Sequence, residues 1–311
     1  EYNKLHRVVF DKLGYTDAEI VHPSNEDAYA SIAPGYSLKW RKNCWKGLVA
    51  GDLLRKMQEQ TRPYEMEKGK TDKVYGIYLQ KAILSVENNC KGLSNVLMEA
   101  AEQFKSISVV NFGSKPIVAI VGEIFMRDNP FCSNFLVQRL ENLGAETVMA
   151  PFAEWVNYST IRFVRDSRWK GNMKNLVKAK IQLFFQKSME KKLTGSLKDI
   201  YKLKREVEVE EMLENCGEYI HKDYDGDPPL AIGSAVLLAE KQIAGVVNIL
   251  PFTCMPGTIN CAVSQNLRKN NHGLPWENFA YDGHDNVGLD TRFEAFMFQV
   301  KEYHEKQKML V

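Results

Sequence analysis

The sequence lacks the short motifs that usually identify a metal or nucleotide site. Its six cysteines form no CxxC pair and there is no HExxH, so the usual zinc spacings are absent. It also contains no P-loop, no GxGxxG and no GxSxG. The sequence therefore gives no support for these phosphate-binding loops or for an acyl-transfer serine.

The chain also has little net charge and no long apolar run. Its 41 basic and 39 acidic side chains leave a net charge of +2, which predicts no nucleic-acid partner. The longest apolar stretches, such as residues 243–250, are far shorter than the ~20 residues of a membrane helix, and no basic-then-apolar leader opens the chain. We expect no membrane association. Irregularly spaced cysteines in a chain this long predict reduced thiols and a cytoplasmic location.

Hydrophobic periodicity divides the chain near residues 113–116. Residues 1–113 are predicted to be helix-rich, with helices over about 3–13, 45–62 and 93–104 and another starting near 72. Because the chain starts at Glu1 directly in a helical pattern, we expect this part to be the remainder of a truncated α/β domain. Residues 114–311 are predicted to form an α/β domain with a doubly wound, mostly parallel, flavodoxin-like sheet.

The second part alternates strands and helices around a long insertion. Strands are predicted over 117–125, 147–150, 246–252 and 277–281, and helices over about 133–143 and 258–269. Thr291 and Glu294 fit a capping box at the start of the last helix. A helical insertion is expected over about 159–218, with a basic first half and an acidic end. Its predicted buried side carries Met173, Val177, Ile181 and Phe184.

The charges of the insertion allow two interpretations. They can form a solvated face, or they can form a docking surface for an acidic partner.

Three loops follow predicted strands, where open parallel sheets bind their ligands. The first carries Glu123, Arg127 and Asp128. These side chains either contribute to a site, or Arg127 and Asp128 pair on the surface while Ser133 caps the next helix. The third loop carries Asp282, Gly283 and His284, and a lone loop histidine is usually only exposed.

The second loop, PFTCMPG, runs from Pro251 to Gly257 and contains the strongest candidate, Cys254. A cysteine between a buried strand and a helix start lies where backbone N–H groups and the helix dipole stabilise a thiolate. Gly257 would let the backbone approach a bulky ligand closely. Cys254 therefore suits metal or cluster ligation, redox chemistry or nucleophilic attack, although cysteine is also a common small core residue.

The stretch 251–258, together with Tyr281-Asp282-Gly283 and residues 291–296, resembles the 2-hydroxyacyl-CoA dehydratase component superfamily. It is most similar to the large CoA-substrate-specific enzyme activases, which fuse such a component to ATPase modules. Further matching stretches occur in order along nearly the whole chain, at residues 2–6, 62–65, 115–116, 122–127, 154–155 and 232–235.

The resemblance implies an iron–sulfur protein in which three cysteines of each subunit hold a cluster, of the 4Fe–4S type. Only the last of these carries over, onto Cys254, because the other two lie upstream of the motif with which this chain begins. Cys44 matches no family ligand. We therefore expect a cluster in the full-length protein and none bound to this fragment. Glu123, Arg127 and Asp282 would line the cavity, beside Pro251 and Gly257.

Three functional hypotheses follow. The first is electron transfer from an ATP-driven activase module of the same or a partner chain, with a CoA thioester or another small molecule as substrate. The second is a non-catalytic docking or regulatory domain of a larger activase-type polypeptide. The third is a thiolate enzyme without a metal.

Overall fold

The computed structural model describes residues 2–20, 37–201, 203, 207–240, 243–283 and 288–309. Within them lies a four-stranded sheet of order β2-β1-β3-β4 in which every pair is parallel. The strands are β1 (Ile117–Gly122), β2 (Glu146–Met149), β3 (Gly245–Pro251) and β4 (Trp276–Tyr281). The strands β1 and β3 are neighbours in the sheet although β2 lies between them in the sequence, as in flavodoxin-like doubly wound sheets. The predicted fold class is therefore confirmed.

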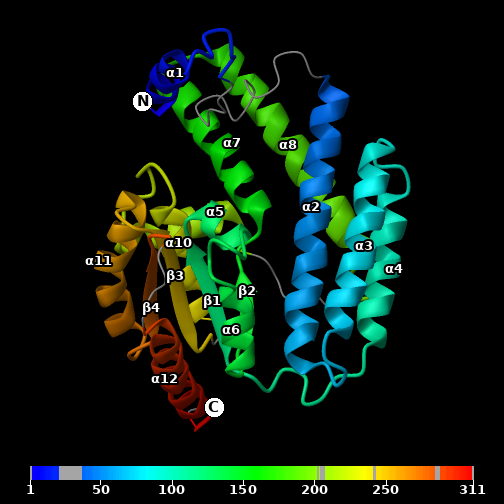
Figure 1. The fold of residues 1–311 in the computed structure, drawn as a ribbon, viewed down its shortest axis with the longest axis vertical. Coiled ribbons are helices and arrows are strands. Elements are labelled where there is room, and N and C mark those ends of the chain that lie inside the picture. Colours follow the sequence, from blue (N-terminus) through cyan, green and yellow to red (C-terminus); the bar gives the residue numbers. More distant parts are fainter. Residues whose placement is uncertain are drawn as a thin grey trace.

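Helices cover both faces of the sheet (Figure 1). On one face lie α6 (Leu136–Asn142) and α12 (Leu289–Met309), whose Leu140 and Phe296 are buried against β1 and β3. On the other lie α10 (Pro228–Ala239) and α11 (Met255–Asn270), whose Ile232 and Leu267 are buried there. We call the sheet with these helices and α5 (Ile124–Asp128) the sheet lobe.

The remaining long helices form a second layer, which we call the helical lobe. It contains α2 (Leu38–Thr61), α3 (Lys70–Glu87), α4 (Leu93–Ser106) and α8 (Met173–Gly195). Their shared core includes Leu54, Leu97 and Phe104 together with Leu193, so residues from both sides of the Gly113 boundary pack in one core. The helix α7 (Phe152–Trp169) lies between the lobes, and α1 (Tyr2–Lys12) lies above it in the view of Figure 1.

Several helices and strands begin or end at other residues than predicted. The strand predicted to reach residue 125 ends at Gly122, because α5 begins at Ile124. The predicted insertion starts earlier, since α7 begins at Phe152, and continues through α8 to α9 (Val209–Asn215) and a short 3-10 turn, Cys216–Glu218. The capping box was wrong: α12 begins at Leu289, which places Thr291 inside its first turn.

The contact between the lobes protects the edge of the sheet. The edge strand β2 lies beside α2, and Glu59 of α2 accepts a hydrogen bond from the backbone of Met149. A free strand edge invites pairing with another chain, so this helix has a protective role. Among the described residues, no helix is both long enough and apolar enough to cross a membrane.

Candidate functional site

The carboxyl ends of β1, β3 and β4 lie along one edge of the sheet. Gly122 pairs with Ile249, and Pro251 pairs with Tyr281, so the three candidate loops leave the sheet at neighbouring positions. The crevice between β1 and β3 is the topological switch point, where ligands of open α/β sheets bind. The structure therefore places the predicted loops where the sequence predicted them.

The end of β1 is built around Gly122. Its φ is +108°, and a Cβ there would lie 2.1 Å from the carbonyl oxygen of Ile249, so no other residue fits. The next residue, Glu123, donates its backbone N–H to that same oxygen at 2.9 Å. The Glu123 carboxylate accepts from the N–H groups of Phe125 and Met126 and caps α5. This side chain is thus already used for local structure.

Cys254 lies at the N-cap of α11, immediately after β3. Its backbone N–H donates to Pro251 at 3.0 Å, and its carbonyl accepts from the backbone and hydroxyl of Thr258 at 2.9 and 2.8 Å. The thiol itself makes no capping hydrogen bond. Thr253 beside it has φ of +64°, a left-handed conformation that costs a β-branched residue about 1–3 kcal/mol. Such strain is typical of functional loops.

Gly257 has a packing role that the sequence did not predict. It is buried, and a Cβ at this position would lie 2.5 Å from the Cβ of Leu250 in β3. The glycine is thus required for close packing of α11 on its own preceding strand.

The other thiols near the edge are less suited to ligation. Cys261 accepts a weak hydrogen bond from Asn248 at 3.7 Å, and burial raises the pKa of its thiol. Cys132 packs against the core on the α6 and α12 face. Burial also raises the pKa of Cys216. Within the described part of the chain, no three His, Cys, Asp or Glu side chains are placed to hold a metal ion.

Arg127 is buried and does not pair with Asp128 on the surface. Its guanidinium lies 3.9 Å from Glu154 of α7, and its Nε has no hydrogen-bond partner within the described residues. Asp128 pairs with Arg55 of α2 instead. Ser133 does not cap α6, since its hydroxyl donates to the carbonyls of Asn129 and Pro130.

A buried acid that was not predicted from the sequence lies at this end of the sheet. Asp227 precedes α10 and is held near Arg127 and Glu123. Burial raises the pKa of Asp227 to about 7, with Glu123 raising it further and Arg127 opposing the shift. The dipeptide Asp227-Pro228 was the available signal, because an acid before proline is typical of a helix start.

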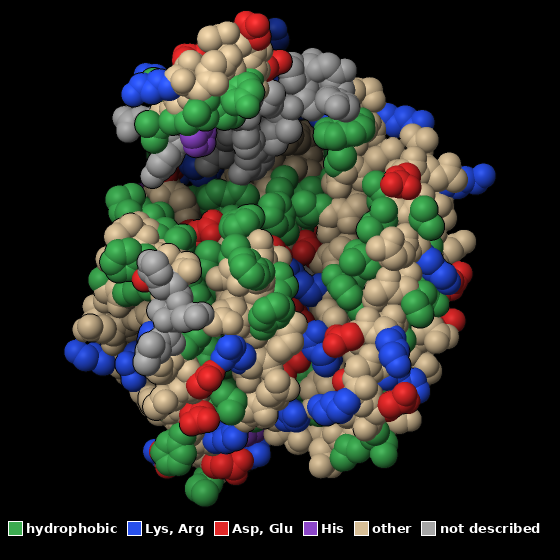
Figure 2. Space-filling model, in the orientation of Figure 1, with side chains coloured by type: hydrophobic (Ala, Val, Ile, Leu, Met, Phe, Trp, Pro, Cys, Tyr) green, Lys and Arg blue, Asp and Glu red, His purple; other side chains and the backbone are tan. Residues whose placement is uncertain are grey.

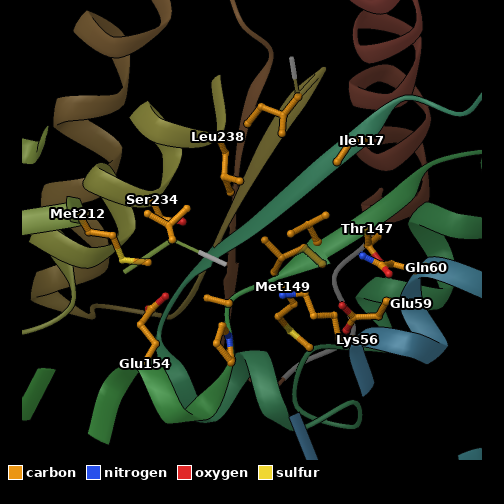
Figure 3. A pocket seen from close by; sticks show the side chains of 16 residues that line it. Lys56, Glu59, Gln60, Ile117, Thr147, Met149, Glu154, Met212, Ser234 and Leu238 are labelled. Atoms are coloured by element: carbon orange, nitrogen blue, oxygen red, sulfur yellow. The ribbon is translucent and has the colours of Figure 1, made fainter. Parts of the chain in front are cut away.

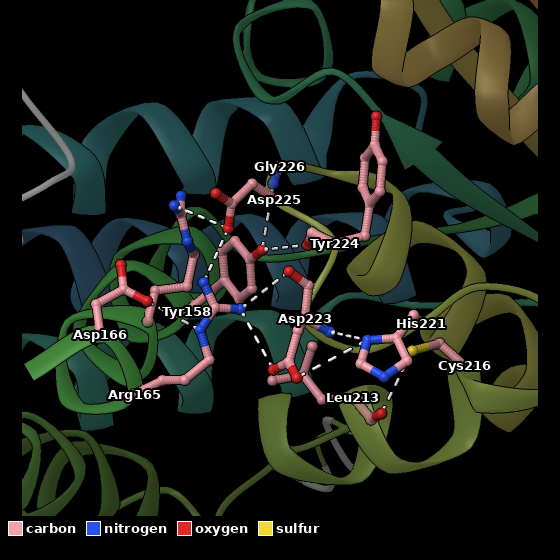
Figure 4. A network of polar contacts seen from close by, with 11 residues as sticks. Tyr158, Arg165, Asp166, Leu213, Cys216, His221, Asp223, Tyr224, Asp225 and Gly226 are labelled. Atoms are coloured by element: carbon pink, nitrogen blue, oxygen red, sulfur yellow. Dashed lines mark hydrogen bonds and ion pairs between the residues drawn. The ribbon is translucent and has the colours of Figure 1, made fainter. Parts of the chain in front are cut away.

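The loop before Asp227 is fixed by a polar network on α7 (Figure 4). Arg165 pairs with Asp223 at 3.4 Å and with Asp225 at 2.9 Å. The Tyr158 hydroxyl donates to the carbonyl of Tyr224 and accepts from the N–H of Gly226, both at 3.2 Å. A Cβ on Gly226 would lie 3.8 Å from Pro256, so the network also positions this loop beside the start of α11.

Asp282 follows β4 and is exposed, two strands away from Glu123. Phe252 donates its backbone N–H to Tyr281 at 2.8 Å, which holds the second and third loops together at their bases. His284, in the same loop as Asp282, lies outside the described residues.

Exposed apolar side chains stand around these loops. Phe125 and Phe131 follow β1, and Phe252 and Met255 flank Cys254. Large exposed apolar groups that cluster near a polar site are typical of binding surfaces.

The two lobes also enclose a cavity of about 320 Å³. Figure 3 shows Glu59 and Gln60 of α2 on one side of it and Glu154 on another, with Met149 between them and Leu238 in the upper part of the view. Burial raises the pKa of Glu59 to about 7. None of the predicted loop residues lines this cavity, whereas Arg127 borders a separate polar cavity of about 410 Å³ toward α2.

No protein-family model, curated protein or solved structure matches this chain.

Proposed function

We propose that this chain is part of an iron–sulfur electron-transfer protein related to 2-hydroxyacyl-CoA dehydratase components. Cys254 is one ligand of its cluster. The proposal rests on one observation: Cys254 stands at the carboxyl end of β3, at the start of α11, with a thiol that makes no capping bond. A helix N-terminus of this kind stabilises a thiolate.

The described residues fit one corner of a cluster. A cubane cluster takes about four ligands, usually thiolates, and this edge offers Cys254 alone. The remaining ligands therefore come from other parts of the polypeptide or from a partner subunit. When bound, the cluster supplies one-electron transfer at low potential.

The residues of this chain have separate parts in the proposal. Cys254 binds the cluster, and the exposed side chains of Phe252 and Met255 lie near it in the same loop. Arg127 and Asp227 are buried near the ends of β1 and α5, and Arg127 lies 3.9 Å from Glu154 of α7. The electron comes from an ATP-driven activase module and passes to a CoA thioester or another small molecule.

Iron and acid-labile sulfide in the anaerobically purified full-length protein test the proposal. Cys254→Ser is expected to lose most of the iron, since a hydroxyl is a poor cluster ligand. Cys261→Ser is the matched control on the same helix and is expected to keep it. Equal iron in wild type and Cys254→Ser contradicts the proposal.

The apolar rim favours a second candidate, a docking or regulatory domain within a larger polypeptide. Phe125, Phe131 and Phe252 are all more than half exposed. A neighbouring domain that covers them needs no cluster. Full-length protein that stays free of iron after anaerobic reconstitution with iron and sulfide supports this candidate over the first.

A further inference from the structure

The helix α8 has two apolar faces, and only one of them is buried. Leu176, Ala179 and Leu193 point into the protein. The side predicted to be buried lies outside: Met173 is 66%, Val177 52%, Ile181 52% and Phe184 68% exposed. These four residues recur at spacings of four, four and three, so they form one continuous stripe. The prediction for this side was wrong because the opposite side meets α2 and α7.

Three exposed lysines flank the stripe. Lys174 and Lys178 lie on one side of it and Lys180 on the other, all exposed. Within the described residues, none of the three forms an ion pair, whereas Lys187 further along α8 pairs with Glu208 at 3.4 Å and Glu210 at 2.6 Å. Among the described residues, acidic partners are thus placed beside Lys187 but not beside the three lysines of the first half of the helix.

One residue of the stripe, Ile181, also lines a concave surface beside it. A cavity of about 770 Å³ lies where α2, α5, α7 and α8 meet, and it is lined by Trp45, Phe125, Trp155, Ile181 and Phe185 among others. Lys178 stands at its border, and Lys42 lies 4.6 Å from the centre of the Phe185 ring. Figure 2, drawn in the orientation of Figure 1, shows hydrophobic side chains at the border of a hollow in the upper half of the molecule.

We propose that the outer face of α8 and this groove bind an acidic amphipathic helix of a protein partner. The apolar ridge of such a helix fits the groove, and its carboxylates meet Lys174, Lys178 and Lys180. The groove beside the stripe favours a helix over a lipid surface, because grooves of this kind take up the apolar face of an amphipathic helix. The docking surface does not involve Cys254, so it stands independently of the cluster.

Synthetic helical peptides test this directly. The probe carries leucines on one face and glutamates on the other; a second peptide replaces each glutamate with lysine, and a third scrambles the order. We expect the glutamate peptide alone to bind wild-type protein in a fluorescence anisotropy titration. Its affinity is expected to fall as salt rises, since salt screens the lysines.

Matched variants locate the site. Lys174→Glu with Lys178→Glu is expected to weaken the peptide at least about tenfold, and Val177→Ser with Ile181→Ser by a similar factor. Lys73→Glu with Lys105→Glu makes the same change of charge elsewhere, and Ile77→Ser with Leu84→Ser removes comparable exposed apolar groups from α3. Both control pairs are expected to change affinity by less than about threefold.

Equal weakening by the control pairs, or no binding of the glutamate peptide, overturns the proposal. Vesicles of phosphatidylcholine with phosphatidylserine form the other arm. Vesicle binding that is lost in the α8 variants, without peptide binding, assigns the face to an anionic lipid surface instead. Circular dichroism of each variant establishes that it is folded.

Discussion

Two regions of the molecule differ in whether their side chains have partners among the described residues. One is the contact between the two lobes, and the other is the outer face of α8. At the contact, Arg55 of α2 pairs with Asp52 at 3.1 Å, Glu59 at 3.7 Å and Asp128, and donates to the carbonyl of Ala150. Asp52 in turn accepts from Phe152 and Ala153 at the start of α7. On the outer face of α8, exposed apolar side chains and exposed lysines lie side by side. The charges of the first surface are paired by other described residues of this chain, whereas we propose that a partner protein matches the second.

Breaking the interlobe network gives the largest expected effect. Arg55→Met leaves three carboxylates without their cation and is expected to lower the free energy of unfolding by about 3–5 kcal/mol. Arg292→Met is the control, because Arg292 is half exposed where it pairs with Glu277, so its loss costs at most about 1 kcal/mol. Urea unfolding measures both. Equal losses would mean that the network contributes no more than a surface pair.

The buried acid of the sheet edge is expected to make stability depend on pH. The folded pKa of Asp227 is about 7, above its ordinary value, so the folded state holds a proton that the unfolded state releases. Stability therefore falls as the pH rises from about 4 to 7, by at most about 1.4 kcal/mol per pH unit for this group. Asp227→Asn is expected to flatten the slope in urea titrations. An unchanged slope would show that Asp227 does not titrate there.

A smaller effect is expected inside the sheet lobe. Gly257→Ala brings a methyl group against Leu250 and is expected to cost about 1–3 kcal/mol. Gly76→Ala in the middle of α3 meets no atom within 4 Å and is expected to stabilise the protein by up to about 1 kcal/mol. Thermal unfolding compares the two. A loss at both positions would contradict the packing role of Gly257.

The smallest expected effect is on the outer face of α8. Val177→Ser and Phe184→Ser are expected to change the free energy of unfolding by less than about 0.5 kcal/mol each, because both side chains are already more than half exposed. A loss above about 2 kcal/mol in urea would mean that this chain itself covers the stripe, and the contrast with Arg55 would disappear.

Local patterns predicted most of the fold. The spacing of Trp45, Val49 and Leu53 predicted α2, and the apolar run after Pro116 predicted β1. The predicted strand was longer than β1 because Phe125, which is exposed on α5, continues the apolar run in the sequence. The face of α8 was misassigned because both of its sides are apolar, and periodicity does not choose between them.

The site was predictable only in part, for a related reason. Cys254 is identified by its place between a strand and a helix, which is local information. The partner of Arg127, by contrast, is Glu154 on another helix, and Asp52 caps α7 across about 100 residues of sequence. Such pairs follow from how the lobes meet, which short-range patterns do not contain.

Low-temperature electron paramagnetic resonance of the reduced full-length protein tests the central claim most directly. We predict the signal of a reduced iron–sulfur cluster in wild type and in Cys261→Ser, and its loss or a changed line shape in Cys254→Ser. An identical signal in Cys254→Ser would contradict the assignment of Cys254 as a ligand. The absence of a signal from wild type reconstituted with iron and sulfide would contradict the cluster itself.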